Sequence, residues 1–210
     1  MDNLLGITDP LELAHREEEL TKARALELFD LGLIDSFEVG TFKGLSQIHG
    51  HLFQDVYAFA GRMRDVNIAK GSFRFAPRLY LPEALAAIDS MPEGTFDQII
   101  EKYVEMNVAH PFREGNGRAT RIWLDCMLKA GLGRVVDWSK VDGEDYLLAM
   151  ERSPVRDTEI KRVLGDALTD RVSDRQVYMK GIDASYRYEG YDTYPLTRED
   201  SRGGQETPFS

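Results

Sequence analysis

Apolar residues recur along most of the chain at the three-to-four-residue spacing of amphipathic helices. In residues 17–31, for example, leucines and alanines fall on one side and Gly32 follows as a stop signal. The same reasoning predicts helices over these ranges: 17–31, 41–59, 82–91, 95–109, 116–130, 143–151, 155–168 and 173–190. We therefore expect a mainly α-helical fold.

Several of the predicted helices carry start and stop signals. Thr95 is a suitable N-cap for the helix that Pro111 ends, and Asn116 can cap the next one. The last helix begins with a capping-box pattern over residues 173–176, and Gly190 suits its C-terminus.

One segment, residues 62–77, breaks the helical pattern. Short alternating runs flank a Lys70-Gly71-Ser72 turn, which predicts a β-hairpin and is the one convincing β element. We expect a core over residues 17–172 with this hairpin inside it, and a helix over 173–190 packed on that core. The expected flanking parts are an N-terminal extension, residues 1–16, and a flexible tail, residues 191–210.

Charge and hydropathy argue against two classes of partner. The chain has 26 Lys and Arg against 36 Asp and Glu, a formal net charge of -10. This balance argues against duplex nucleic acid as the main partner, although basic residues could cluster locally. No segment reaches membrane-spanning length, and the N-terminus lacks a basic region followed by an apolar run, so we expect a cytoplasmic protein without a membrane partner.

The stretch HPFREGNGRATR, residues 110–121, combines a glycine loop with arginines at the expected start of a helix. The backbone amides of residues 115–117 would point into one concavity, which is an anion-binding arrangement. Arg118 and Arg121 lie on the same helical turn, where positive charge opposes the helix dipole. Phosphate oxygens would satisfy both the amides and the arginines.

Two further side chains in this stretch fit phosphate chemistry. Glu114 adds a carboxylate beside the anion site, and Mg²⁺ bridging it to phosphates would make that favourable. His110 ends the preceding helix, and an imidazole with an ordinary pKa of about 6.5 can accept a proton at neutral pH. Together they indicate group transfer from a nucleoside polyphosphate. Structural alternatives remain open: His110 could cap carbonyls, Glu114 could pair with Arg118, and the glycines could serve a tight turn.

The same stretch resembles the signature of the Fic (filamentation induced by cAMP) family. That pattern orders His, Phe, an acidic residue, Gly or Ala, Asn, Gly or Lys, and two arginines. Every defined position is filled here, by His110, Phe112, Glu114, Gly115, Asn116, Gly117, Arg118 and Arg121. The resemblance implies a helical Fic fold with a small β-hairpin flap, in which Phe112 anchors the loop against the core.

The resemblance also implies an activity, the transfer of AMP from ATP to a Tyr, Thr or Ser hydroxyl of a target protein. In that reaction His110 would deprotonate the hydroxyl and Glu114 would hold Mg²⁺. The Gly115–Gly117 nest would cradle the phosphates, and the two arginines would neutralise them. The implied cofactors are ATP and Mg²⁺, and the implied partner is an unidentified hydroxyl-bearing protein.

In Fic domains a flap beside the motif docks the target backbone as strand addition would. The matching segment here is residues 67–75, with these candidate docking residues: Asn67, Lys70, Gly71, Ser72 and Phe73. A plain surface hairpin fits the sequence equally well. For Lys70 a solvated turn lysine is the alternative.

The end of the last predicted helix carries a second charge in an unfavourable place. Glu189 falls in the last helical turn, where a carboxylate opposes the dipole and needs a cation. Ser185 lies four residues earlier on the same face. Pairing of Glu189 with Arg121, or less favourably with Arg118, would occupy space that the γ-phosphate of ATP requires. A solvated glutamate is the alternative.

The stretch SYRYEG is similar to the inhibitory-helix pattern of some Fic proteins: Ser or Thr, three residues, Glu, then Gly or Asn. The resemblance implies autoinhibition by Ser185, Glu189 and Gly190, with Glu189 binding Arg121. Tyr186 and Tyr188 flank this site. We hypothesise that they accept AMP themselves, which would make the protein one of its own targets.

Two other functions remain open at this point. One is a related transfer, of UMP or of a γ-phosphoryl group as in Doc-type relatives, although Gly117 stands where those have lysine. The other is a non-enzymatic nucleotide-binding module that regulates a partner by contact. His49 and His51 lie in an apolar helical pattern, so we expect partially buried or surface histidines there rather than zinc ligands.

Overall fold

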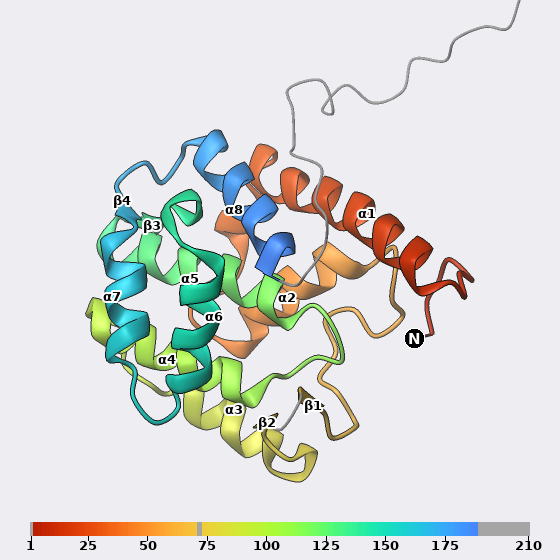
Figure 1. The fold of residues 1–210 in the computed structure, drawn as a ribbon, viewed down its shortest axis with the longest axis horizontal. Coiled ribbons are helices and arrows are strands. Elements are labelled where there is room, and N and C mark those ends of the chain that lie inside the picture. Colours follow the sequence, from red (N-terminus) through yellow and green to blue (C-terminus); the bar gives the residue numbers. More distant parts are fainter. Residues whose placement is uncertain (1, 71–72, 189–210) are drawn as a thin grey trace, which may run out of the picture.

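The computed structural model describes residues 2–70 and 73–188, which form the expected mainly helical fold (Figure 1). The centre is made by α4 (Phe96–Ala109) and α5 (Asn116–Leu132), which are consecutive in the chain and pack against each other. Helix α2 (Phe42–Phe53) lies against α5, and α1 (Pro10–Asp30) lies against α2. Inward-facing apolar residues of α4 and α5 are fully buried, among them Ile99, Ile100, Tyr103, Trp123 and Leu124.

The first helix starts earlier than its periodicity predicts, at Pro10 rather than Glu17. Asp9 caps it by accepting a hydrogen bond from the Glu12 amide at 2.8 Å, and proline is favoured at the first helical position. The preceding residues also join the core, since the Leu4 amide donates to the Val56 carbonyl. Helix α1 therefore runs across the expected boundary at residue 17, while the division of the chain into an extension and a core stays a prediction.

Helix α4 begins as predicted. The Thr95 side chain accepts from the Gln98 amide, and the Gln98 side chain accepts from the Thr95 amide, which makes a full capping box. The prediction for α5 is wrong in detail, because Gly115 occupies the N-cap and Asn116 is the first helical residue. The helix also passes Gly131 and ends at Gly133, which has the left-handed conformation of a C-cap.

Other predicted helices are shorter in the structure. Helix α2 ends at Phe53 and the chain continues through turns, where Val56 and Tyr57 are still buried. Helix α3 spans Leu81–Asp89. None of the helices in residues 2–70 and 73–188 combines the length and the apolar character needed to cross a bilayer.

Two small antiparallel sheets occur in the described residues, not one. The expected hairpin pairs β1 (Ala69–Lys70) with β2 (Phe73–Arg74). A second ladder pairs β3 (Val135–Val136) with β4 (Leu168–Thr169) and closes off the segment that holds α6 (Gly143–Arg152) and α7 (Thr158–Asp166). Because each strand has only two residues, the second pair gives too little alternation to be recognised in the sequence.

The last helix, α8 (Arg175–Tyr188), lies across the core beside α1 (Figure 1). Asp174, rather than the predicted Ser173, caps it by accepting from the amides of Gln176 and Val177. Gly181 allows a close approach to Trp138, since an added Cβ would lie 3.0 Å from the indole Cδ1. Up to Tyr188, the last helix thus packs against α1, α5 and α6.

Candidate active site

His110 is held at the C-terminus of α4 in the left-handed conformation, with φ at 49°. Its amide donates to the Met106 carbonyl at 3.0 Å, and its own carbonyl accepts from Arg64 Nε at 2.8 Å. The imidazole stacks on the ring of Phe75, with 3.7 Å between the centroids. The backbone and the ring of His110 are thus both fixed by neighbouring groups.

The glycine loop before α5 is fixed by the side chain of Asn116. Its amide nitrogen donates to the Phe112 carbonyl at 2.9 Å, and its oxygen accepts from the Phe112 amide at 2.8 Å. Phe112 is fully buried, as its expected anchoring role requires. Gly115 has φ at 73°, and an added Cβ would overlap the ring of Phe53, so no other residue fits this backbone and this ring.

Glu114 is half-buried, with 39% of its side chain exposed at the mouth of the loop. Its Oε1 accepts from the Gly115 amide at 3.1 Å and lies 3.4 Å from Nη2 of Arg118. The structural alternative for Glu114, pairing with Arg118, therefore does occur. It coexists with exposure of the carboxylate to solvent.

Arg118 is buried in an environment that satisfies its charge. Its Nη1 donates to the carboxylate of Glu17 in α1, and both side chains are less than 5% exposed. The guanidinium also lies between two rings, 4.8 Å from the Phe53 centroid and 5.1 Å from that of Tyr186. The anion that Arg118 was expected to lack is thus supplied in part by the protein itself.

Glu17 is a site residue that the sequence reasoning missed. Besides Arg118 it accepts a hydrogen bond from the Tyr57 hydroxyl, so this carboxylate ties α1 to the segment after α2 and to α5. A signal was present in the sequence, because Glu17 shares one helical face with Leu13 and Leu20. A carboxylate on an apolar helical face is expected to be buried, and a buried carboxylate needs a cation as its partner.

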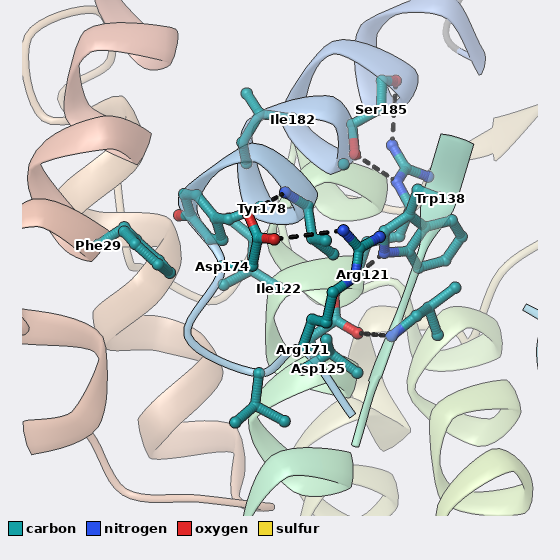
Figure 2. A pocket seen from close by; sticks show the side chains of 15 residues that line it. Phe29, Arg121, Ile122, Asp125, Trp138, Arg171, Asp174, Tyr178, Ile182 and Ser185 are labelled. Atoms are coloured by element: carbon teal, nitrogen blue, oxygen red, sulfur yellow. Dashed lines mark hydrogen bonds and ion pairs between the residues drawn. The ribbon is translucent and has the colours of Figure 1, made fainter. Parts of the chain in front are cut away.

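Arg121 reaches the last helix, where Nε donates to Ser185 Oγ at 2.7 Å and Nη2 to the Ser185 carbonyl at 3.1 Å (Figure 2). Its guanidinium also lies 5.5 Å from the Tyr188 ring centroid. Arg121 thus contacts Ser185 of the last helix, whereas the predicted pairing of Arg121 was with Glu189. Glu189 and Gly190 lie outside the described residues.

The cavity drawn in Figure 2 lies between α5 and α8 and measures about 40 Å³. That is room for water molecules, not for a nucleotide. Asp125 lines it and accepts from the Val136 amide at 2.8 Å and from the Trp138 indole at 3.0 Å. Burial raises the pKa of Asp125 to about 7. The bond from the indole to Asp125 fixes the ring that Gly181 approaches closely.

Tyr186 and Tyr188, the candidate sites of self-modification, are both buried in α8. The Tyr186 hydroxyl bonds to Thr21 of α1, and burial raises the pKa of Tyr186 to about 12. The Tyr188 hydroxyl donates to the Val141 carbonyl at 3.0 Å, and burial likewise raises its pKa to about 12. Neither hydroxyl is accessible to accept AMP while α8 is packed on the core.

His49, expected to be a partially buried or surface histidine, is fully buried and supports the motif directly. Its Nδ1 accepts from the Gly61 amide at 2.9 Å, which leaves Nε2 to donate to the Glu114 carbonyl at 2.9 Å. The ring stacks on Phe112 with 3.8 Å between the centroids. Burial lowers the pKa of His49 to about 3, so the ring stays neutral and keeps this tautomer.

This burial gives a pH-dependent prediction for His49→Gln, which has no titrating group. Below pH 6.5, the ordinary pKa of histidine, His49 binds a proton in the unfolded chain but stays neutral in the folded chain. The stability advantage of the wild type over the variant should therefore shrink as the pH falls below 6.5, by up to about 1.4 kcal/mol per pH unit and by about 2 kcal/mol in all between pH 7.5 and 5. Urea unfolding of both proteins at pH 7.5 and pH 5 measures this, and a difference that stays constant would contradict it.

The flap residues are only partly described. Asn67 Oδ1 accepts from the Arg78 amide at 2.7 Å and closes the base of the hairpin. The backbones of residues 70 and 73 pair in the β1–β2 ladder. Gly71 and Ser72 lie outside the described residues, so the docking role of this set stays a prediction.

Comparison with known proteins agrees with this geometry. The family model described as Fic/DOC matches residues 41–128. The protein adenylyltransferase VbhT of Bartonella schoenbuchensis is 32% identical over 177 residues, which are 78% of this chain and 36% of that protein. The probable protein adenylyltransferase Fic of Salmonella typhimurium is 30% identical over 175 residues, covering 78% of this chain and 84% of the relative.

Solved structures show the same fold. The BepC protein of Bartonella tribocorum with bound AMPPNP matches with a TM-score of 0.64 and 21% identity, over 80% of this chain and 92% of that one. A Fic domain from Bartonella quintana with bound ADP matches with a TM-score of 0.65. The chain belongs to the Fic/DOC family. It spans about a third of VbhT but most of the Salmonella relative.

Proposed function

We propose that this protein is a Mg²⁺-dependent protein adenylyltransferase that transfers AMP from ATP to a Tyr, Thr or Ser hydroxyl of a target protein. The observation that carries the proposal is the folded motif itself. His110 ends α4, and α5 begins five residues after Pro111 behind an N-cap glycine, Gly115, which has no side chain to bond the first amides of the helix. The names of the Bartonella and Salmonella relatives support the same reaction.

The residues present suit a nucleotide with its metal ion. The N-terminus of α5 offers the backbone amides of residues 116–118 to phosphate oxygens. Glu114 is half-exposed beside them, and a single carboxylate plus phosphates is a common environment for Mg²⁺. When bound, Mg²⁺ supplies charge neutralisation on the phosphates.

The chain's own residues would divide the remaining work. His110 takes the proton of the attacking hydroxyl, and its fixed backbone and stacked ring limit the directions in which it can point. Arg118, held by Glu17, keeps its Nη2 directed at Glu114 and so orients that carboxylate. Arg121 contributes positive charge on the face of α5 that meets α8. The flap residues would dock the target backbone beside His110.

We also propose that α8 restrains this activity, with Glu189 as the obstructing group and Arg121 as its partner. The support is the packing of α8 on the core and the two hydrogen bonds from Arg121 to Ser185, four residues before Glu189.

If α8 restrains the activity, Tyr186 and Tyr188 become acceptors only after α8 dissociates from the core, because both are buried while it is packed there. If neither tyrosine carries AMP after incubation of an activated variant with ATP, self-modification at these positions is wrong.

Glu189→Gly is expected to raise AMP transfer by about 5- to 150-fold, the range of typical coupling free energies between sites. The physical reason is removal of a carboxylate that competes with phosphate for Arg121. Intact mass after incubation with ATP, Mg²⁺ and a lysate measures transfer. Glu151→Gly, at an exposed position near the C-terminus of α6, is the matched control and should behave as the wild type.

The position of a radioactive label in ATP tests the proposed reaction. Label retained on protein from the α-phosphate supports AMP transfer. Retention from the γ-phosphate alone would replace the proposal with phosphoryl transfer. Label retained from α-labelled UTP in preference to ATP would replace it with UMP transfer.

A further inference from the structure

Arg64 lies between the flap and residues 108–115, the end of α4 and the loop after it, which we call the catalytic loop. The proposed reaction has given Arg64 no role so far. Its side chain is 2% exposed although it carries a full charge. Desolvation lowers the pKa of Arg64 below its ordinary value, but an arginine remains protonated in a protein. Within residues 2–70 and 73–188 this guanidinium pairs with no carboxylate.

Four backbone carbonyls replace the missing carboxylate, and they come from two different parts of the site. On the catalytic side, Nε donates to the carbonyl of His110 at 2.8 Å and Nη2 to that of Ala109 at 3.1 Å. On the flap side, Nη1 donates to Val66 at 2.6 Å and Nη2 to Ala76 at 2.5 Å. The planar guanidinium therefore holds a fixed distance between Val66 and Ala76 on the flap side and His110 on the catalytic side.

Contacts that do not involve this side chain bring the same two parts together. The Arg64 amide donates to the Pro111 carbonyl at 2.8 Å, and the Ala76 amide donates to the Val108 carbonyl at 3.1 Å. The Phe75 ring stacks on the imidazole of His110. The flap base, defined here as residues 64–69 and 74–78, thus contacts the catalytic loop through backbone, ring and guanidinium.

The charge and the backbone geometry explain why an arginine suits this place. The last carbonyls of α4 have no partners within the helix and lie at the negative end of its dipole, so a buried cation is favoured there. His110 has the only positive φ among the non-glycine residues of the described chain. Such a conformation persists when its surroundings fix it, and the bond from Arg64 to the His110 carbonyl does so.

We propose that Arg64 is a positioning residue: its guanidinium joins the carbonyl of His110 to both edges of the flap base, so that target docking and the catalytic imidazole keep one relative geometry. The catalytic part of this inference rests on the proposed function. The structural part, that Arg64 couples the flap base to His110, does not depend on it.

Arg64→Lys tests the coupling by hydrogen exchange. Lysine keeps the charge, but its compact ammonium cannot span four carbonyls. The amides of residues 64 and 76, which bond to Pro111 and Val108, should exchange about tenfold faster or more, and the Tyr103 amide in the middle of α4 should not change. Unchanged exchange at residues 64 and 76, or equal acceleration at Tyr103, would overturn the proposal.

Two further variants make the result specific. Arg78→Lys is the matched control, because Arg78 is an exposed arginine of the flap base that bonds to the Asp65 carbonyl and not to the catalytic loop. It should leave all these exchange rates unchanged. Phe75→Leu loosens the flap from the other side, and both it and Arg64→Lys should shift the His110 ring signals in NMR spectra. A His110 signal that stays in place in both variants counts against the coupling.

Kinetics in the Glu189→Gly background distinguish a positioning role of Arg64 from a general loss of structure at the site. With Arg64→Lys, transfer at saturating ATP should fall about 10- to 100-fold, while the Kd for ATP from calorimetry stays within about twofold. Parallel losses in rate and ATP affinity would mean a merely structural role and would overturn the catalytic part. If no variant, including Glu189→Gly itself, transfers AMP, the proposed function fails, and the exchange rates alone decide the coupling.

Discussion

Replacing His110 with asparagine is expected to lower AMP transfer by about 10²- to 10⁴-fold, the usual contribution of a general base. Asparagine tolerates the left-handed conformation that this position requires, so the backbone bonds to Met106 and Arg64 should survive. Its amide cannot accept the proton of the target hydroxyl. The measurement is retention of α-phosphate label on protein in the Glu189→Gly background.

A histidine outside the site provides the control for this prediction. His15 is exposed on α1, and His15→Asn should transfer AMP at the rate of the parent. Thermal unfolding should give similar midpoints for both asparagine variants and the parent. If His110→Asn keeps more than a tenth of the parent rate, His110 is not the base.

Glu17→Ala is expected to destabilise the fold by about 3–5 kcal/mol, the usual cost of removing one partner from a buried ion pair. The variant leaves the Arg118 guanidinium buried without its carboxylate from α1, and the Tyr57 hydroxyl loses its acceptor. Equilibrium unfolding in urea measures the loss. Glu19→Ala, two residues along the same helix at a largely exposed site, should change the free energy of unfolding by no more than about 0.5 kcal/mol.

A double variant tests whether the loss comes from the pair itself. Glu17→Gln with Arg118→Met removes both charges and keeps an apolar side chain between the rings of Phe53 and Tyr186. The two single changes should then be non-additive by about 0.5–3 kcal/mol, with the double variant more stable than their sum predicts. Additive effects would show that Glu17 and Arg118 act separately.

The motif and the helical fold could be predicted because their determinants are local. The spacing of apolar residues placed the central helices, and Thr95 marked the start of α4 correctly. The signature over residues 110–121 identified the family, and Phe112 is buried as expected. Errors at helix ends came from local signals that compete, such as Asp9-Pro10 ahead of the periodic residues of α1.

The supporting residues could not be predicted because their partners lie far away in the chain. Glu17 meets Arg118 across 101 positions, and His49 meets the Glu114 carbonyl across 65. Arg64 bonds to backbone carbonyls, which carry no side-chain signature at all. One sequence shows which groups can react. The groups that hold them in place become visible only when distant segments are brought together.

The contact between Gly115 and Phe53 limits how this chain can vary. The family pattern admits alanine at this position, yet here a methyl group would overlap an aromatic ring as well as strain the backbone. Which residues are tolerated at position 115 of the signature thus depends on Phe53, which lies 62 positions earlier and outside the signature. Relatives with alanine in the loop should have a smaller side chain facing it, so the two sites are expected to change together over evolutionary time.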